Sequence, residues 1–115
     1  MYIYHITSNE EWLSQSPLGS YSPANYLKDG FIHCSTRDQV QPVADRFYHG
    51  QPGLVVLEID PSNLGQQVVY ENLEGGSELF PHIYSPLPIS AVEKVYTLFV
   101  KSDQSFDFTK VFQES

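Results

Sequence analysis

Alternation of apolar and polar residues predicts several short β-strands along the chain. Residues 2–7 alternate like a half-buried strand, whereas residues 54–59 are apolar and β-branched, which is typical of a strand buried on both faces. Further strands are predicted at residues 31–34, 67–71 and 91–100. The proline-rich segment 80–84 should be extended but not central in a sheet, because proline cannot donate a ladder hydrogen bond.

Capping residues and helical periodicity predict two or three short helices. Ser8 and Glu11 form a capping box, so a helix should cover residues 9–15 and bury Trp12 and Leu13. A one- or two-turn helix should begin at Ser22-Pro23, run through Leu27 and be terminated by Gly30. Residues 37–48 should form an amphipathic helix, since apolar side chains recur at helical spacing at Val40, Val43, Ala44 and Phe47.

The stretch from Asp29 to Thr36 combines a turn, a strand and the start of a helix within eight residues. Strand alternation places Phe31, His33 and Ser35 on one face and Ile32 and Cys34 on the other. An imidazole and a hydroxyl at the end of a strand suit a polar or anionic ligand. The alternative interpretation is a His33 that is hydrogen-bonded for structural reasons. Cys34 is predicted to be buried and unreactive.

Two loops and the C-terminal tail complete the predicted organisation. Residues 16–23 form a polar loop long enough to act as a flap over a site. Residues 72–78 are acidic, contain Gly75-Gly76 and are predicted to be mobile. The tail, residues 101–115, should dock either as an edge strand or as a helix.

Length and composition predict one domain in a reducing compartment. A chain of 115 residues can build a single core, and its one cysteine excludes an internal disulfide framework. It contains no run of 18 apolar residues and starts without a basic region, so we expect a cytoplasmic protein that does not enter membranes.

Charge and aromatic content restrict the classes of ligand. Fourteen acidic residues against six basic ones give a formal charge of −8, which argues against an extended nucleic-acid track. A local basic pocket that binds a single phosphate is still compatible with this charge. The sixteen aromatic residues, eight of them tyrosines, could pack a core or stack a base or nicotinamide.

The histidines are the main candidates for chemistry. His5 and His33 each stand two residues before a hydroxyl residue at a strand end, Thr7 and Ser35 respectively, and His82 lies in the proline-rich segment. None has the close pair spacing that usually anchors zinc, so no metal ligands are assigned. Cys34 and His33 point to opposite faces, which excludes His33 as its catalytic base. Acid–base candidates among the carboxylates are Glu58, Glu71 and Glu74, with Glu71 the most interesting.

Several motifs in this order resemble the domain-of-unknown-function family 952. They are Tyr4-His5-Ile6-Thr7, Trp12, Gly30-Phe31-Ile32-His33-Cys34-Ser35, Ala44 with Phe47, residues 54–60, and Phe80-Pro81-His82-Ile83-Tyr84 with Pro86-Leu87. The resemblance covers about residues 2–100. That family in turn looks like a remote, compact relative of the ADP-ribosyltransferase fold, in which a split antiparallel sheet holds NAD in a cleft.

The resemblance implies a fold and a set of roles. The fold would be α+β, with a curved, mainly antiparallel split sheet of about six strands and two or three helices. His5 and His33 would orient the nicotinamide ribose, and His82 would approach the reacting carbon or its acceptor. Thr7, Ser35 and Tyr48 would contact the nucleotide. The glutamate that commonly completes such sites on a late strand has no clear counterpart near His82.

Three functional hypotheses follow. The favoured one is an ADP-ribosyltransferase-like domain that binds NAD, as substrate, or another ADP-ribose-bearing nucleotide in a histidine-lined cleft. The alternatives are a non-catalytic nucleotide- or peptide-binding module and a metal-dependent hydrolase using His5, His33 and His82. We predict that His5 and His33 enter one cleft from neighbouring strands. We also predict that replacing His82 impairs function more than folding.

Overall fold

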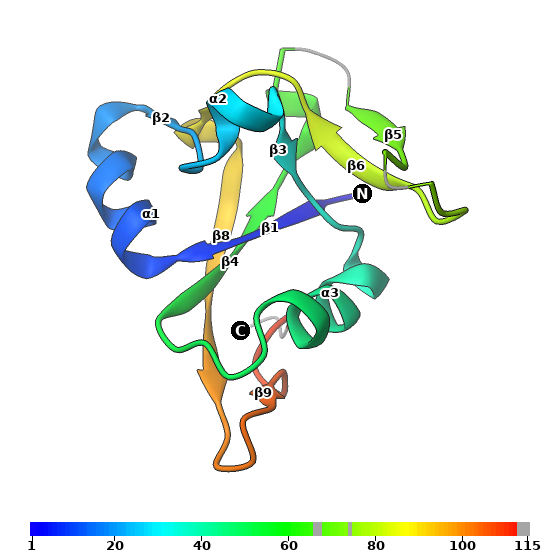
Figure 1. The fold of residues 1–115 in the computed structure, drawn as a ribbon. Helices are drawn as coiled ribbons and strands as arrows, with labels where there is room; N and C mark the ends of the chain where they lie inside the picture. The colour runs from blue at the N-terminus through cyan, green and yellow to red at the C-terminus, as the bar shows by residue number, and fades with distance from the viewer. Residues whose placement is uncertain (66–67, 74, 113–115) are drawn as a thin grey trace.

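A four-stranded antiparallel sheet, of order β1-β4-β8-β9, forms the middle of the molecule (Figure 1). The structure is a computed structural model that describes residues 1–65, 68–73 and 75–112. The strands of this sheet are β1 (Ile3–Ser8), β4 (Leu54–Ile59), β8 (Val92–Val100) and β9 (Phe106–Asp107). All six residues of β4 are buried, as its continuous apolar sequence predicts.

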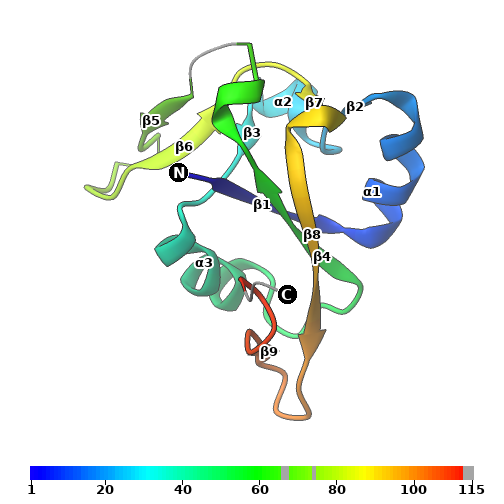
Figure 2. The same cartoon turned by 180° about the vertical axis from the view of Figure 1, so that it is seen from behind.

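Two smaller antiparallel sheets lie beside the first one (Figures 1 and 2). One has the order β3-β6-β5, with β3 (Ile32–His33), β6 (Phe80–Ile83) and β5 (Val69–Glu71). The other pairs β2 (Ser20–Tyr21) with β7 (Leu87–Pro88). An isolated bridge between Tyr4 and Ser35 connects the first sheet to the segment that follows β3.

The helices are short, and local capping explains where they begin and end. They are α1 (Asn9–Gln15), α2 (Tyr26–Asp29) and α3 (Val40–Phe47). Single 3₁₀ turns cover η1 (Ser16–Leu18), η2 (Arg37–Gln39), η3 (Pro61–Asn63) and η4 (Ile89–Ala91). Ser8 accepts a hydrogen bond from the Glu11 N–H at 3.0 Å, and Thr36 with Gln39 forms the predicted capping box. Gly30 ends α2 with φ of 81°, a left-handed conformation that favours glycine.

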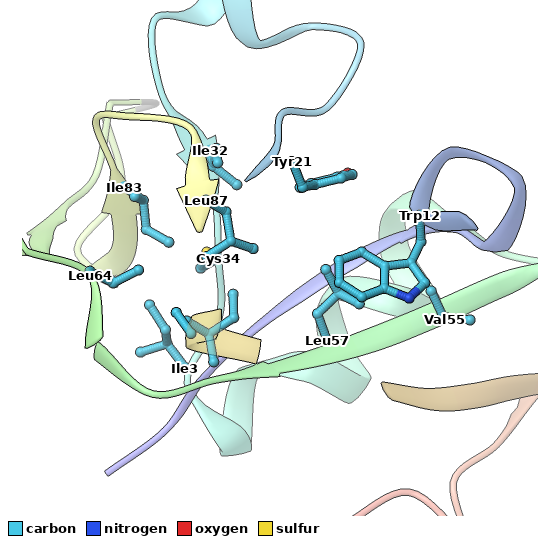
Figure 3. Close-up of a cluster of buried hydrophobic side chains, with 12 residues drawn as sticks. Ile3, Trp12, Tyr21, Ile32, Cys34, Val55, Leu57, Leu64, Ile83 and Leu87 are labelled. Carbon is cyan, nitrogen blue, oxygen red and sulfur yellow. The ribbon is translucent and has the colours of Figure 1, made fainter. Parts of the chain in front are cut away.

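Two hydrophobic cores lie on the two faces of the central sheet. Figure 3 shows the first core, which contains side chains from β1, β3, β4, β6 and β7 together with Trp12 and Tyr21. The second core packs α3 and the segment after β9 against the opposite face, through Tyr4, Ile6, Val40, Ala44, Leu98 and Phe106 among others. Fully burying one such Leu or Ile side chain contributes about 2 kcal/mol to stability, so the paired cores hold β1 and β4 firmly in place.

The prediction for residues 80–84 is wrong, because β6 is the central strand of its sheet. Pro81 is tolerated there because its carbonyl accepts from the Cys34 N–H at 3.0 Å, while β3 already ends at His33. The absent proline N–H therefore falls beside Cys34, just past the end of the β3 ladder, where no strand partner requires it.

Two helical side chains are more exposed than predicted. Leu13 is 58% exposed, since α1 is only seven residues long and turns one face, with Trp12, to the core. Phe47 is 57% exposed at the end of α3, although Val40 and Ala44 of the same stripe are buried.

Residues 16–23 do not form a flap. They contain η1 and β2, and Tyr21 is fully buried and paired with Leu87 of β7. Burial of this large aromatic residue ties the segment to the first core.

The α+β class and the antiparallel pairing are confirmed, whereas the number of strands is larger than expected. Within the described ranges the chain forms nine strands. The sequence predicted fewer because two-residue strands such as β2 and β7 are too short to give a clear alternating pattern. The tail docks as an edge strand, β9, which settles the open choice for its described part. Gln67, Glu74 and residues 113–115, which belong to predicted segments, lie outside the described residues. In the part of the chain that the structure covers, no helix is long and apolar enough to cross a bilayer.

Candidate functional site

A cleft of about 650 Å³ opens between α3 and the loop that joins β5 to β6. This volume falls in the range of small-molecule binding sites, and half of the lining residues are apolar or aromatic. β1 and the segment after Gly30 also contribute side chains to the cleft. Its lining comprises Tyr4, Ile6, Phe31, His33, Cys34, Ser35, Val43, Arg46, Phe47, Tyr48, Glu71, Asn72, Leu73, Gly76, Ser77, Glu78, Phe80 and His82.

His82 and Glu71 form the most buried polar pair of the cleft. The His82 Nδ1 atom lies 2.9 Å from Glu71 Oε1, and His82 is only 4% exposed. The Tyr84 hydroxyl donates to the same carboxylate oxygen. These two hydrogen bonds, that of Tyr84 first, hold the pKa of Glu71 below its usual range. The Glu71 carboxylate is therefore stabilised in its ionised form.

Phe31 joins the two histidines of the cleft. Its ring stacks on His82 with centroids 4.2 Å apart and lies 4.6 Å from the His33 ring. The left-handed turn at Gly30 ends α2 and places Phe31 directly before β3. Phe31, His33 and Ser35 line the cleft, and Cys34 also borders it, although Cys34 packs with Ile32 in the first core as strand alternation predicts.

His33 is the exposed member of the histidine pair. Its side chain is 54% exposed, and its Nε2 atom lies 3.1 Å from Asp29 Oδ2 in the preceding helix. Asn25 donates to the same Asp29 oxygen at 2.8 Å. His33 and His82 are directly opposite each other in the β3–β6 register, and their rings are 5.3 Å apart.

The carboxylates determine which ring nitrogens carry protons. Because a carboxylate only accepts, His82 donates from Nδ1 to Glu71 and His33 donates from Nε2 to Asp29. In the neutral form of each ring, the other nitrogen is therefore the basic one. The cleft thus holds two imidazoles, each oriented by a carboxylate, which is an arrangement suited to proton transfer.

Ser35 and Tyr48 also line the cleft. Ser35 is positioned by two backbone hydrogen bonds to Tyr4, at 2.7 and 2.8 Å. Tyr48 follows α3, and burial raises the pKa of its phenol. Arg46 places its guanidinium 5.0 Å from the Phe47 ring centroid and is the one Lys or Arg among the described lining residues. The lining also contains the carboxylates of Glu71 and Glu78.

The structure places His5 and Thr7 outside this cleft, which corrects the prediction that His5 and His33 enter it together. Tyr4 and Ile6 line the cleft, so alternation along β1 turns His5 and Thr7 to the opposite face. There His5 Nδ1 lies 2.6 Å from the His33 carbonyl and Nε2 lies 3.0 Å from the Tyr21 hydroxyl. His5 touches the backbone of His33, not its ring.

The three candidate histidines therefore do not converge. Across the described ranges, no three His, Cys, Asp or Glu side chains come together in an arrangement that would hold a metal ion. Glu58 is buried and accepts from Tyr96 at 3.0 Å and from Tyr4 at 3.3 Å. Cys34 is 4% exposed, and burial raises its pKa, in agreement with the predicted buried thiol.

Sequence reasoning did not connect Glu71 or Asp29 with the histidines. Glu71 was a candidate on its own, at a strand end, but its contact with His82 depends on the β5–β6 register. Asp29 stands four residues before His33, and a helix end followed by a turn brings the two together. The four-residue spacing between Asp29 and His33 is the sequence signal that could have indicated their contact. For Glu71, the signal is its place in a predicted strand that could pair with the segment containing His82.

Comparisons with known proteins agree on one family and on the fold. A family described as "Protein of unknown function (DUF952)" matches residues 6–95. The crystal structure of protein CC0527 from Caulobacter crescentus is 35% identical, covers 94% of this chain and 95% of its own, and has a TM-score of 0.83. Its solution NMR structure is 35% identical with a TM-score of 0.80, covering 93% and 92% of the two chains. No curated protein matches the sequence significantly.

Proposed function

This chain belongs to the DUF952 family of proteins of unknown function, and we propose that its cleft binds NAD or another ADP-ribose-bearing nucleotide. His33, His82 and Glu71 would surround the reacting ribose. The observation that carries the proposal is a pair of histidines on the wall of one cleft, with rings 5.3 Å apart and each hydrogen-bonded to a carboxylate.

The shape and lining of the cleft support a nucleotide ligand. Aromatic side chains stack readily on flat heterocycles, and Phe31, Phe80 and Tyr48 are part of the lining. The Arg46 guanidinium could pair with a phosphate. A ligand with a cationic ring, such as nicotinamide in NAD, also suits a cleft in which Glu71 is held in its ionised form.

The chemistry consistent with this geometry is cleavage of the bond between nicotinamide and ribose. Nicotinamide would leave with the bonding electrons, and positive charge would develop on the ribose carbon. The Glu71 carboxylate, beside His82, supplies the negative group that stabilises such charge. An acceptor hydroxyl or water would then attack, and the basic Nδ1 of His33 would take its proton.

Binding can be tested by titration calorimetry with NAD and with ADP-ribose. We expect binding by the wild type and at least a tenfold weaker affinity, about 1.4 kcal/mol, for His33→Ala. His49→Ala is the matched control, because His49 is exposed and outside the cleft lining. Absence of binding to both nucleotides, or equal affinities in the two variants, would refute the proposal.

A second candidate is a module that binds the nucleotide without turning it over. The single Arg46 and the polar, half-exposed His33 favour recognition as much as catalysis. The rate at which nicotinamide is released from NAD separates the two functions. If the cleft is catalytic, the wild type releases nicotinamide faster than the Glu71→Gln variant does. If the protein only binds the nucleotide, the rate does not exceed that in buffer alone.

A further inference from the structure

A hydrogen-bonded chain of side chains runs through the interior from the backbone beside the cleft to α1. It begins at the His33 carbonyl, which lies 2.6 Å from His5 Nδ1. His5 Nε2 lies 3.0 Å from the Tyr21 hydroxyl, and that hydroxyl lies 2.7 Å from Thr7 Oγ1. Thr7 Oγ1 in turn lies 3.0 Å from Glu11 Oε2. Four polar contacts therefore follow one another without a branch.

Both ends of this chain only accept hydrogen bonds. A backbone carbonyl has no hydrogen to donate, and neither has an ionised carboxylate. The other carboxylate oxygen, Glu11 Oε1, accepts from the Ala24 N–H at 2.8 Å, so Glu11 is held in place from the loop before α2. The hydrogens for the four contacts must come from the three groups between the ends.

These three groups supply one hydrogen too few. A neutral imidazole has one N–H, and the Tyr21 and Thr7 hydroxyls have one hydrogen each. With Glu11 ionised, one of the four contacts would then set two lone pairs against each other at 3.0 Å or less. Such a contact is unfavourable in a buried setting, and Tyr21, His5 and Thr7 are all buried.

We propose that the His5–Tyr21–Thr7–Glu11 chain takes up one additional proton as a unit, and that this proton completes the connection between α1 and the β3 backbone at the cleft. His5 is thus a positioning residue that acts on His33 through its carbonyl oxygen. This role differs from contact with the ligand and does not depend on what the cleft binds.

The added proton has two places within this hydrogen-bonded chain. On Glu11, the carboxyl group donates to Thr7, Thr7 to Tyr21, Tyr21 to His5 Nε2, and His5 Nδ1–H to the carbonyl. On His5, the imidazolium donates at both ends, and the hydroxyls turn toward the carboxylate. Moving each hydrogen across its own contact converts one state into the other. Of the two groups that can hold the proton, Glu11 is half-buried and His5 is buried, so the proton enters at Glu11.

The surroundings set the pH range of this uptake. Burial lowers the pKa of His5 to about 4, although the His33 carbonyl and the Glu11 charge oppose that effect. The titratable groups that act electrostatically on His5 are Glu11 from α1 and His33 from β3, and those that act on Tyr21 include Glu11, Tyr48 and Cys34. Burial raises the pKa of both Cys34 and Tyr48, so they stay neutral in acid. Uptake is therefore expected well below neutral pH.

Nuclear magnetic resonance can follow the proton directly. We would record the His5 ring nitrogens, the Glu11 carboxyl carbon and the His33 and Cys34 amides in the ligand-free protein, from about pH 8 to about pH 4. If the chain titrates as a unit, all these signals move with one midpoint. Separate midpoints for His5 and Glu11 would overturn the proposal.

Glu11→Gln provides a sharp variant, because its amide donates the missing hydrogen to Thr7 without an added proton. His5 should then keep Nδ1 protonated and Nε2 unprotonated through the whole range, while Glu10→Gln, an exposed control on α1, behaves like the wild type. Thr7→Val interrupts the chain and should separate the two midpoints. If the His5 ring titrates in Glu11→Gln or in Thr7→Val as it does in the wild type, the proposal that His5 and Glu11 take up the proton together is refuted.

Discussion

The His82 imidazole and the Glu71 carboxylate are joined by a 2.9 Å hydrogen bond between the paired strands β6 and β5. This contact turns a histidine in a proline-rich segment into half of an oriented acid–base pair. It also supplies, from another strand, a carboxylate that the proline-rich segment 80–84 does not itself contain.

Replacing Tyr84 with Phe should change the pH dependence of ligand binding. The Tyr84 hydroxyl is the first cause of the lowered pKa of Glu71, so its removal returns that pKa toward the ordinary value. Glu71 would then become protonated at a higher pH, and the loss of affinity in acid would begin at a higher pH. Calorimetric titrations with NAD at several pH values measure this shift. Tyr70→Phe, on β5 and outside the cleft lining, should leave the profile unchanged.

Replacing His82 with Ala should reduce ligand affinity by tenfold or more, about 1.4 kcal/mol. The change removes the partner of Glu71 and the ring that stacks on Phe31. Function should suffer more than folding, because Pro81 and the β3 and β5 ladders still hold the strand. Calorimetry and urea unfolding on the same sample compare the two effects. A loss of about 1–3 kcal/mol in stability with affinity intact would identify His82 as part of the scaffold.

The buried His5 should make the protein less stable in acid. Burial lowers its pKa from 6.5 to about 4, so the unfolded chain binds the proton more readily between these values. The stabilising contribution is complete above pH 6.5 and is lost as the pH falls toward 4, with a total of about 3 kcal/mol. Urea unfolding at neutral and acidic pH measures this difference. It should shrink in His5→Gln and persist in His49→Gln; equal slopes in both variants would contradict the assignment.

Cys34 should resist thiol reagents in the native state. Its side chain is 4% exposed in the first core, and burial raises its pKa, so little thiolate is present. We expect labelling by a disulfide reagent to be much slower than for a free thiol and to become fast in urea. Labelling of the folded protein at the rate of the unfolded chain would show that the segment opens readily.

Local sequence determined much of the backbone. The Ser8 and Thr36 caps, Gly30 at the end of α2 and the apolar run of β4 act through neighbours in the chain, so their patterns are legible without the fold. Alternation also predicted that Phe31, His33 and Ser35 share a face, because successive strand residues point to opposite sides.

Tertiary structure alone decided which chemical groups meet. His5 and His33 follow the same local pattern, yet the bridge between Tyr4 and Ser35 sets β1 so that its even positions face the cleft and its odd ones the first core. Glu71 reaches His82 through strand register, and Pro81 is accepted in a central strand because β3 ends beside it. These outcomes depend on pairing between strands that are distant in sequence. The register of that pairing is set by burial of a whole face of each sheet and not by the sequence neighbours of each residue.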